Sequence, residues 1–310
     1  MKHYKVKSYS RQAGMTLIEL SVVLLILVGL AGLLIPYVGS FTQTTHDSTN
    51  SNNITQLNNA FLRYTSEKNK LPPHVDLLTN GVAGTGTGSC STAQTVGSIY
   101  CGLANSALFT PVTYAADSVA ANSLASSGIN MAVANDPTIP NKTFGTSTAM
   151  IYLDDPAGPV TVPTGGTAGY NGTTAFAAVA ATTTPALSVE QHLAKALGRD
   201  AMVYNSTCYD YIGVGLGDNN ELIQSTMAAA PVFFPQDAKA GPTEAYGHFI
   251  AILQVDKANT GANMMGQKCS GVTEKAKFLG VVANVPATES PTLVGSNTLL
   301  AQTYTNRAAN

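Results

Sequence analysis

Residues 14–38, which read GMTLIELSVVLLILVGLAGLLIPYV, decide the fold of this chain. From residue 20 to residue 38 the only polar side chain is that of Ser21, and nothing in that run is charged. A helix needs roughly 20 apolar residues to cross a bilayer, so the pattern predicts a transmembrane helix over residues 15–38. One carboxylate, Glu19, stands at the front of the apolar run, where its charge needs an explanation.

The residues before the apolar run are basic. Lys2, Lys5, Lys7 and Arg11 precede it, and no acidic residue stands before Glu19. This is the charge asymmetry of a membrane-inserted segment whose basic end stays in the cytoplasm. An ordinary secretory signal peptide has the same order of regions. Against that alternative, the apolar run is long, no clear A-x-A cleavage site ends it, and the residues after it continue in a helical pattern.

A specific motif surrounds the start of the run. Gly14 is followed by Met15, the sequence TLIEL, the apolar stretch and Pro36. Together these features resemble the prepilin signature of type IV pilins and type II secretion pseudopilins. The resemblance implies that a membrane-embedded prepilin peptidase removes the leader, residues 1–14, and methylates the new amino group of Met15. The family usually has phenylalanine at that position, and methionine is an apolar variant of it. Glu19 then becomes the fifth mature residue, and Pro36 falls where many members carry a helix-kinking proline.

The resemblance also explains the carboxylate of Glu19. A charge in the hydrocarbon region costs several kcal/mol on insertion scales, although less near a helix end. The positive end of the helix dipole offsets about 0.3–1 kcal/mol of that cost. The family adds a partner, the methylated amine of Met15 on an adjacent subunit, and pairing removes most of the remaining penalty. The simpler alternative is that the side chain only reaches the membrane interface beside a signal sequence.

The helix is expected to continue beyond the apolar run, over residues 15–70. Apolar side chains recur there at spacings of three and four, which predicts one buried face. These residues are Ile54, Leu57, Phe61, Leu62 and Tyr64. Lys68, Lys70 and Pro72-Pro73 form a clear stop signal. Residues 41–53, FTQTTHDSTNSNN, are poor helix formers and are expected to bend or melt. In the competing interpretation a loop there ends the first helix near Ser40.

Residues 71–310 are expected to form a globular head. Between residues 80 and 185, Gly, Ser, Thr and Ala dominate, which predicts short strands and long loops. We expect turns at Ala157-Gly158 and Gly165-Gly166, and the best strand of this stretch at residues 150–155, MIYLDD. Further on, Ser188 is placed to cap a helix over residues 188–200. Its predicted inner face consists of Val189, Leu193, Ala194 and Leu197.

Three strand candidates follow that helix. They are AMVYNSTCYDYIGVGL at residues 201–216, YGHFIAILQV at residues 246–255 and KFLGVVANV at residues 277–285. We read the gaps between them as hairpin-sized, which predicts an antiparallel sheet. The sheet would pack on the exposed half of the long helix. The predicted fold class is therefore α+β, with a long, partly transmembrane N-terminal helix on a C-terminal antiparallel head.

The chain has four cysteines, Cys90, Cys101, Cys208 and Cys269. None forms a C-x-x-C motif, and no His/Cys cluster has the spacing of a zinc site. An even number in an exported chain predicts disulfides, for which three connectivities are possible. Proximity in sequence favours Cys90–Cys101 with Cys208–Cys269, and the alternative is that some of them are free buried thiols. A disulfide loop near the C-terminus is also common in pilin-like heads.

The charge of the chain limits its partners. Only 11% of residues are charged, which is more typical of exported proteins than of cytoplasmic enzymes. Without the four basic residues of the leader, 12 basic and 18 acidic side chains remain, a formal charge of −6. An acidic remainder argues against nucleic acid as the main partner, because affinity for nucleic acid rests largely on Lys and Arg.

No catalytic motif stands out, so we do not expect an enzyme. GxSxG, HExxH, P-loop and dinucleotide-binding patterns are all missing from the sequence. His46, His74, His192 and His248 are scattered and are interpreted as ordinary surface or structural residues. In GDNNELI, Asp218, Asn220 and Glu221 offer oxygen atoms for a calcium ion, as some pseudopilin heads do. The spacing is not that of an EF-hand, and a plain polar turn is the competing interpretation. No other cofactor is expected.

The resemblance therefore predicts a structural protein. It implies a subunit held by a single pass in the bacterial inner membrane, processed by prepilin peptidase, and polymerised on an inner-membrane assembly platform into a periplasmic or extracellular filament. The partners would be other pilin subunits. A type II secretion pseudopilin is the first alternative. An exported, membrane-anchored binding protein or enzyme with an ordinary signal segment is the second, and it predicts cleavage near residues 35–45 or none.

Overall fold

The structure is a computed structural model. It describes residues 17–79, 99, 108–115, 117–135, 156–161, 173–183, 186–233, 247–257, 261–262, 266, 268–284, 293–296 and 298. The chain divides into two compact units, Met1–Thr45 and His46–Asn310. The boundary falls inside the first helix, so the second half of that helix belongs to the same unit as the head.

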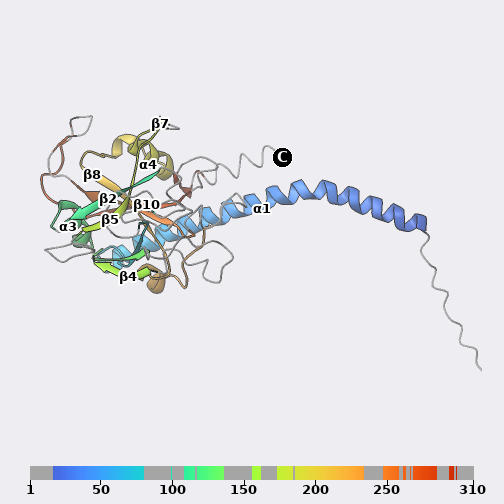
Figure 1. The fold of residues 1–310 in the computed structure, drawn as a ribbon, viewed down its shortest axis with the longest axis horizontal. Helices are drawn as coiled ribbons and strands as arrows, with labels where there is room; N and C mark the ends of the chain where they lie inside the picture. Colours follow the sequence, from blue (N-terminus) through green and yellow to red (C-terminus); the bar gives the residue numbers. More distant parts are fainter. Residues whose placement is uncertain are drawn as a thin grey trace, which may run out of the picture. The chain divides into compact units, whose positions relative to one another are not determined.

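The described helices are α1 (Leu17–Lys68), α3 (Val119–Ser127), α4 (Val189–Leu197), the 3-10 helix η2 (Ala201–Val203) and α5 (Glu221–Thr226). The described strands are β1 (Val75–Leu77), β2 (Phe109–Ala115), β3 (Met131–Asn135), β4 (Pro156–Thr161), β5 (Thr173–Val179), β6 (Thr182–Thr183), β7 (Ala186–Leu187), β8 (Tyr209–Gly215), β9 (Ile250–Asp256), β10 (Lys277–Asn284) and β11 (Leu293–Val294). The α+β class predicted from the sequence is confirmed (Figure 1).

Helix α1 runs without a break through residues 41–53, so the expected melting there and the alternative of a loop near Ser40 are both wrong. Tertiary contacts explain why poor helix formers stay helical. Asp47, Asn50 and Ser51 lie buried within the second unit. The hydroxyl groups of Ser51 and Ser296 are 2.9 Å apart, which ties the helix to a residue far along the chain. Such contacts override a weak intrinsic preference of fractions of a kcal/mol per residue.

The strands form one large sheet in the order β11-β10-β9-β8-β1-β3-β4, and β8 is its branch point. Residues 214 and 215 of β8 pair with β1, whereas residues 212 and 213 pair with β5, which in turn pairs with β2. Gly213 suits this fork, because a Cβ atom there would lie only 2.6 Å from Cε1 of Phe109. The β8–β9–β10 core is antiparallel, as predicted, whereas β1 and β3 are parallel.

The sheet is covered on both faces, which explains why its central strands are apolar almost throughout. Alternate residues of β9 point to opposite sides: Ala251, Leu253 and Val255 join one cluster, and Ile250 and Ile252 join another. The first cluster contains α1 and α3, and the second contains α4. The head is thus built in layers, with the sheet between helices (Figure 1).

The buried face of α1 consists of Ile54, Leu57, Phe61 and Tyr64, each at most 1% exposed. The ring of Phe61 stacks on that of Phe278 from β10, with centroids 4.0 Å apart. Leu62, which the periodicity placed on the same face, is 60% exposed, so that part of the prediction is wrong. At 100° per residue it points away from its neighbour Phe61.

Other expectations fail or fall outside the described residues. Ala157-Gly158, expected to form a turn, lies inside β4, where Gly158 pairs with Ala134 of β3. The predicted strand at residues 150–155 and the turn at Gly165-Gly166 lie outside the described residues. The gap between β8 and β9 is not a hairpin, because α5 is inserted there.

Candidate functional site

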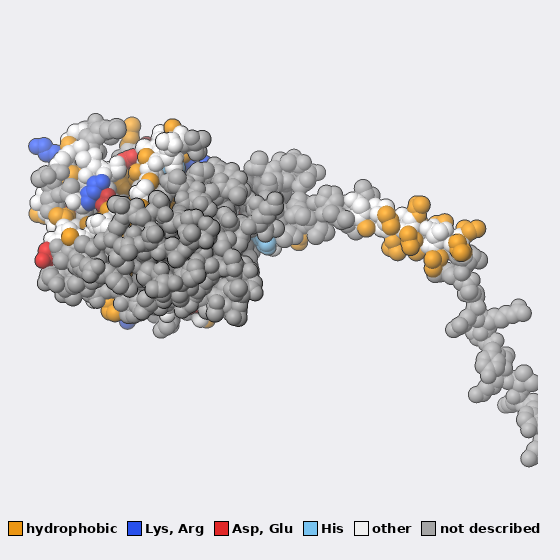
Figure 2. Space-filling view, viewed as in Figure 1, with side chains coloured by type: hydrophobic (Ala, Val, Ile, Leu, Met, Phe, Trp, Pro, Cys, Tyr) orange, Lys and Arg blue, Asp and Glu red, His pale blue; other side chains and the backbone are white. Residues whose placement is uncertain are grey.

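The first unit presents an apolar helix surface. Every described side chain between residues 17 and 32 is exposed, and the large apolar ones have exposed fractions between 48% and 84%. Figure 2 shows these hydrophobic side chains gathered around the start of α1. One shallow depression of the surface is lined by Leu17, Leu20, Ser21, Leu24, Leu25 and Val28, a helical stripe with spacings of one, three and four.

Glu19 lies in the first turn of α1, in the position that the sequence predicts, and its side chain is exposed. Ser21, the other polar residue of this stretch, turns its hydroxyl back to the carbonyl oxygen of Ile18, 2.9 Å away. That local bond satisfies the donor of Ser21 inside the helix itself. Glu19 is the only charged residue among residues 17–32, all of which the structure describes.

The other predicted assembly residues are only partly described. Gly14 and Met15 lie outside the described residues. Pro36 lies within α1, but its side chain is outside the described set, as are all side chains of residues 33–40. Among the described residues we find no helix that combines the length and hydropathy of a membrane span.

In the head, the predicted Cys208–Cys269 disulfide is confirmed. It joins the residue before β8 to the segment before β10, across 61 residues of sequence. The backbone N–H of Lys257, the residue directly after β9, donates to the carbonyl oxygen of Cys208, so the bridge lies next to the paired ends of β8 and β9. Cys90 and Cys101 lie outside the described residues.

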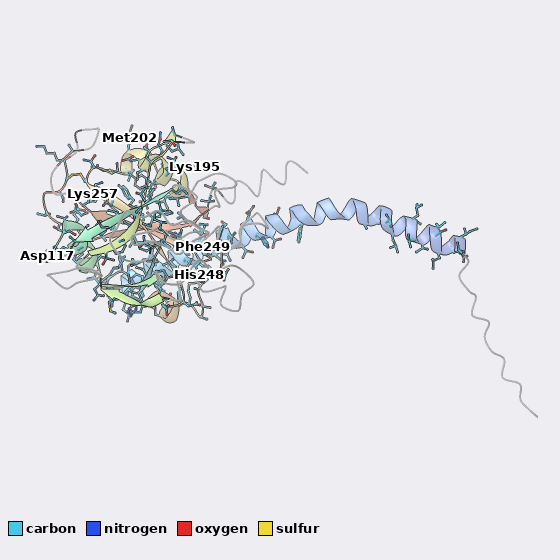
Figure 3. The ribbon with its side chains drawn as sticks, viewed as in Figure 1. Asp117, Lys195, Met202, His248, Phe249 and Lys257 are labelled. Atoms are coloured by element: carbon cyan, nitrogen blue, oxygen red, sulfur yellow. A yellow bond between two sulfur atoms is a disulfide. The ribbon has the colours of Figure 1, made fainter. Side chains whose placement is uncertain are left out.

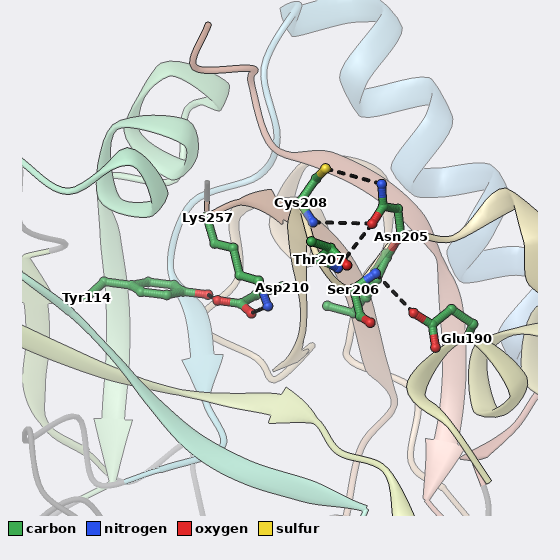
Figure 4. A network of polar contacts seen from close by, with 9 residues as sticks. Tyr114, Glu190, Asn205, Ser206, Thr207, Cys208, Asp210 and Lys257 are labelled. Atoms are coloured by element: carbon green, nitrogen blue, oxygen red, sulfur yellow. Dashed lines mark hydrogen bonds and ion pairs between the residues drawn. The ribbon is translucent and has the colours of Figure 1, made fainter. Parts of the chain in front are cut away.

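A polar network surrounds this end of the sheet (Figure 4). Asp210 accepts a hydrogen bond from the hydroxyl of Tyr114, at 3.1 Å, and forms an ion pair with Lys257, also at 3.1 Å. Burial raises the pKa of Tyr114, and the negative charge of Asp210 raises it further. The phenol therefore stays protonated and acts as a donor at neutral pH. These contacts link β2, β8 and β9, and we interpret them as structural.

A second group of contacts shapes the turn before β8. Oδ1 of Asn205 accepts hydrogen bonds from the backbone N–H groups of Thr207 and Cys208, at 3.0 and 3.3 Å. The N–H of Ser206 donates to Oε1 of Glu190 in the first turn of α4, at 3.0 Å (Figure 4). Helix α4 itself begins as predicted, with Ser188 and Gln191 forming a capping box. The turn of residues 204–207 is thus fixed against the start of α4.

Two tyrosines beside this turn provide a matched test of the packing. Tyr204 and Tyr211 form a T-shaped pair with centroids 5.7 Å apart. The hydroxyl of Tyr211 accepts from the N–H of Asn205 at 2.6 Å, whereas the buried hydroxyl of Tyr204 has no hydrogen-bond partner among the described residues. An unpaired buried polar group costs about 1–3 kcal/mol.

We therefore expect opposite effects from removing the two hydroxyls. Tyr204→Phe should raise the free energy of unfolding by about 1 kcal/mol, because it removes a desolvated donor. Tyr211→Phe should lower it by about 1–3 kcal/mol, because it leaves the N–H of Asn205 without an acceptor. Urea unfolding followed by circular dichroism measures both changes. Equal effects of the two variants would contradict the assigned hydrogen bonds.

The calcium candidates have structural contacts. Asn220 is the N-cap of α5, and its side-chain oxygen accepts from the N–H of Leu222 at 2.9 Å. Asp218 accepts from the N–H of Ala230, and Glu221 lies 3.8 Å from the ammonium of Lys70. No group of three or more His, Cys, Asp or Glu side chains suited to a metal ion occurs in the described part of the chain. The contacts of Asp218 and Asn220 fit a polar turn, and the calcium site stays a prediction.

His192 and His248 each have their own contact in the head. His192 is buried on α4, where its Nε2 lies 3.0 Å from the hydroxyl of Thr182. Burial lowers the pKa of His192, and the positive charge of Lys195 lowers it further, so the ring is neutral at pH 7. Nδ1 of His248 lies 3.3 Å from the carbonyl oxygen of Pro231. These contacts fit the structural roles expected from the sequence.

Comparisons of the chain with protein-family models, with curated proteins and with solved structures found no match.

Proposed function

We propose that this chain is a structural subunit of a type IV pilus or a related pilin-like filament. The observation that carries the proposal is the exposed apolar surface of residues 17–32 with Glu19 as its only charge. An apolar surface of this extent does not stay in water, because contiguous exposed patches of more than a few hundred Å² mark interfaces with proteins or membranes. The prepilin-like motif at residues 14–20 gives this surface its interpretation.

The same surface serves two environments in turn. Before assembly, residues 15–38 lie in the bacterial inner membrane, with the basic leader on the cytoplasmic side. In the filament the apolar stripes of neighbouring subunits replace the lipid, and they pack at spacings of three and four as in the depression lined by Leu17, Leu20 and Leu24. Glu19 pairs with the methylated amine of Met15 on an adjacent subunit and sets the axial register.

The head supports an extracytoplasmic location. The Cys208–Cys269 disulfide needs an oxidising compartment to form and persist. Few charges and an acidic balance outside the leader argue against nucleic acid as a ligand. We assign the head a structural role on the outer surface of the filament. A pilus is favoured over a secretion pseudopilus, because the 265 residues of the second unit make a large head.

Imaging tests this proposal. Immunogold electron microscopy of cells that carry the full-length chain with a C-terminal epitope should show label along surface filaments. The same cells without the tag are the control. Label confined to the cell envelope, with no filament, contradicts a pilus. Loss of exported proteins from the medium after deletion of the gene would support the pseudopilus alternative.

A further inference from the structure

A groove of about 480 Å³ lies on the head beside the turn of residues 204–207. Its walls come from the first turn of α4, from η2 and from that turn. Ligand sites for small molecules commonly have volumes of about 300–1,000 Å³, so one sugar ring or a small disaccharide fits. Sequence reasoning missed this groove, because its lining also includes Ala181 and comes from segments that are brought together only in the folded head.

The polar lining of the groove is dominated by neutral groups. Hydroxyl-bearing residues of the lining are Ser188, Tyr204, Ser206 and Thr207, and amides come from Gln191 and Asn205. Among the described residues of the lining, Glu190 is the only one with a charged side chain. Although burial alone raises the pKa of Glu190, hydrogen bonds from Ser206, from its own backbone and from Ser188 outweigh it and hold the pKa below its ordinary value. The carboxylate is therefore ionised at neutral pH and acts only as an acceptor.

The remaining lining is apolar and partly open to solvent. Met202 is 67% exposed, and Figure 3 shows it at the periphery of the head. Val189, Ala181 and Ala201 supply the other small apolar side chains of the lining. A methionine is an adaptable contact surface, because its side chain is unbranched and polarisable.

We infer that this groove binds a neutral saccharide. A sugar ring presents pairs of hydroxyl groups on its edge and C–H groups on its face. The edge matches the carboxylate of Glu190 and the amide of Gln191, whose nitrogen makes no hydrogen bond among the described residues. The C–H face matches Met202 and Val189.

Other classes of ligand fit the groove less well. An anion would be repelled by the carboxylate of Glu190. A cation would be attracted by the carboxylate of Glu190, but it would leave the amide and hydroxyl donors of the lining without acceptors. A metal ion would find one carboxylate only, and the described residues hold no metal-binding cluster here. The hydroxyl groups of a neutral sugar can donate to the carboxylate of Glu190 and can also accept from the amide and hydroxyl donors of the lining.

The orientation of Glu190 is fixed before a ligand arrives. Its Oε1 accepts from the backbone N–H of Ser206, and Ser206 belongs to the turn that Asn205 holds through two further hydrogen bonds (Figure 4). A carboxylate has about four acceptor directions, and a ligand hydroxyl group competes for them with the donors of Ser206, Ser188 and the Glu190 backbone. A fixed acceptor loses little entropy on binding, which favours affinity.

Saturation-transfer NMR tests the proposal on the full-length chain in lauryldimethylamine oxide micelles, which carry no sugar headgroup. The probes are glucose, galactose, mannose, N-acetylglucosamine and lactose, with sialic acid as the anionic probe and cadaverine as the cationic one. We expect at least one neutral sugar to bind with a Kd on the order of 1 mM, a reasonable affinity for so few heavy atoms. Sialic acid and cadaverine should show no saturable binding at the concentrations at which the neutral sugar binds.

Variants locate the binding. Glu190→Gln keeps the size of the side chain and should weaken the sugar about tenfold, because hydrogen bonds to a charged acceptor are the stronger ones. Met202→Glu changes an exposed residue at the rim of the groove. It should weaken sugar binding by a comparable factor without affecting the fold. Glu67→Gln removes an exposed carboxylate from α1, outside the groove, and should leave Kd unchanged.

Three results would overturn the proposal: no neutral sugar binding up to about fifty times the expected Kd, binding of cadaverine in place of the sugars, or sugar binding that Met202→Glu leaves unchanged. The Met202 variant keeps the test decisive even if Glu190→Gln disturbs the turn. Because micelles hold the chain unassembled, the outcome does not depend on filament formation.

Discussion

Glu19→Ala is expected to remove the chain from filaments while leaving it inserted in the membrane and cleaved after Gly14. In the assembled state the substitution leaves the methylated amine of a neighbouring Met15 without its partner in an apolar environment. Breaking a buried ion pair by removing one member costs about 3–5 kcal/mol, which is a factor of roughly a hundred to several thousand in each contact. Quantitative immunoblotting of sheared filaments against whole cells measures the loss.

Two control variants separate the possible causes. Glu67→Ala removes a carboxylate from the same helix, but this one forms only an exposed ion pair with Arg63 at 2.9 Å and should leave incorporation normal. Glu19→Gln keeps a polar side chain without the charge, and it should fail as Ala does if the ion pair sets the register. Normal incorporation of Glu19→Ala would refute the role assigned to the carboxylate.

Phe61→Ala should give the largest loss of stability among single changes in α1. The side chain is fully buried and stacks on Phe278, so its removal leaves a large cavity between the helix and β10. Such truncations of a buried phenylalanine typically cost 3–5 kcal/mol. Urea unfolding of the full-length chain in micelles, followed by circular dichroism, measures the shift in midpoint.

The neighbouring residue provides the matched control. Leu62 is 60% exposed, so Leu62→Ala should change the free energy of unfolding by no more than about 0.5 kcal/mol. The two variants remove apolar side chains from adjacent positions of one helix, and they differ in which face they occupy. Similar losses from both would mean that α1 does not pack on the sheet through the face containing Phe61.

The local signals in the sequence were reliable where one short segment determines the structure. Lys68 and Pro72-Pro73 marked the end of α1, and the structure ends it at Lys68. Ser188 predicted the start of α4, and Gly198 closes that helix in the left-handed conformation. Caps and breakers act within one turn of backbone, so they can be recognised without knowledge of the rest of the fold.

Tertiary contacts decided the features that sequence reasoning missed. Residues 41–53 look unfavourable for a helix, yet Asp47 and Asn50 are buried against the head. β4 contains Gly158, which reads as a turn residue and is held in a strand by pairing with β3. The parallel pairing of β1 with β3 joins segments separated by more than fifty residues. Each of these depends on a partner that lies far away in sequence.

The proposed assembly residues can be found in the sequence alone, whereas the proposed saccharide groove can be found only in the folded structure. Gly14, Met15 and Glu19 are recognised by a contiguous motif, and their roles remain predictions. The groove combines residues 181, 188–191, 201–202 and 204–207 and becomes visible only when the turn is fixed on α4. In sequence, Glu190 stood out only as a favourable charge in a first helical turn.

The mass of the mature amino terminus tests most directly whether this chain is a processed pilin-like subunit. Mass spectrometry of the N-terminal peptide, from chain purified out of cells that assemble it, should show a protein that starts at Met15 with one added methyl group. A chain that retains residues 1–14, or one that starts beyond Ser40, would contradict the proposal.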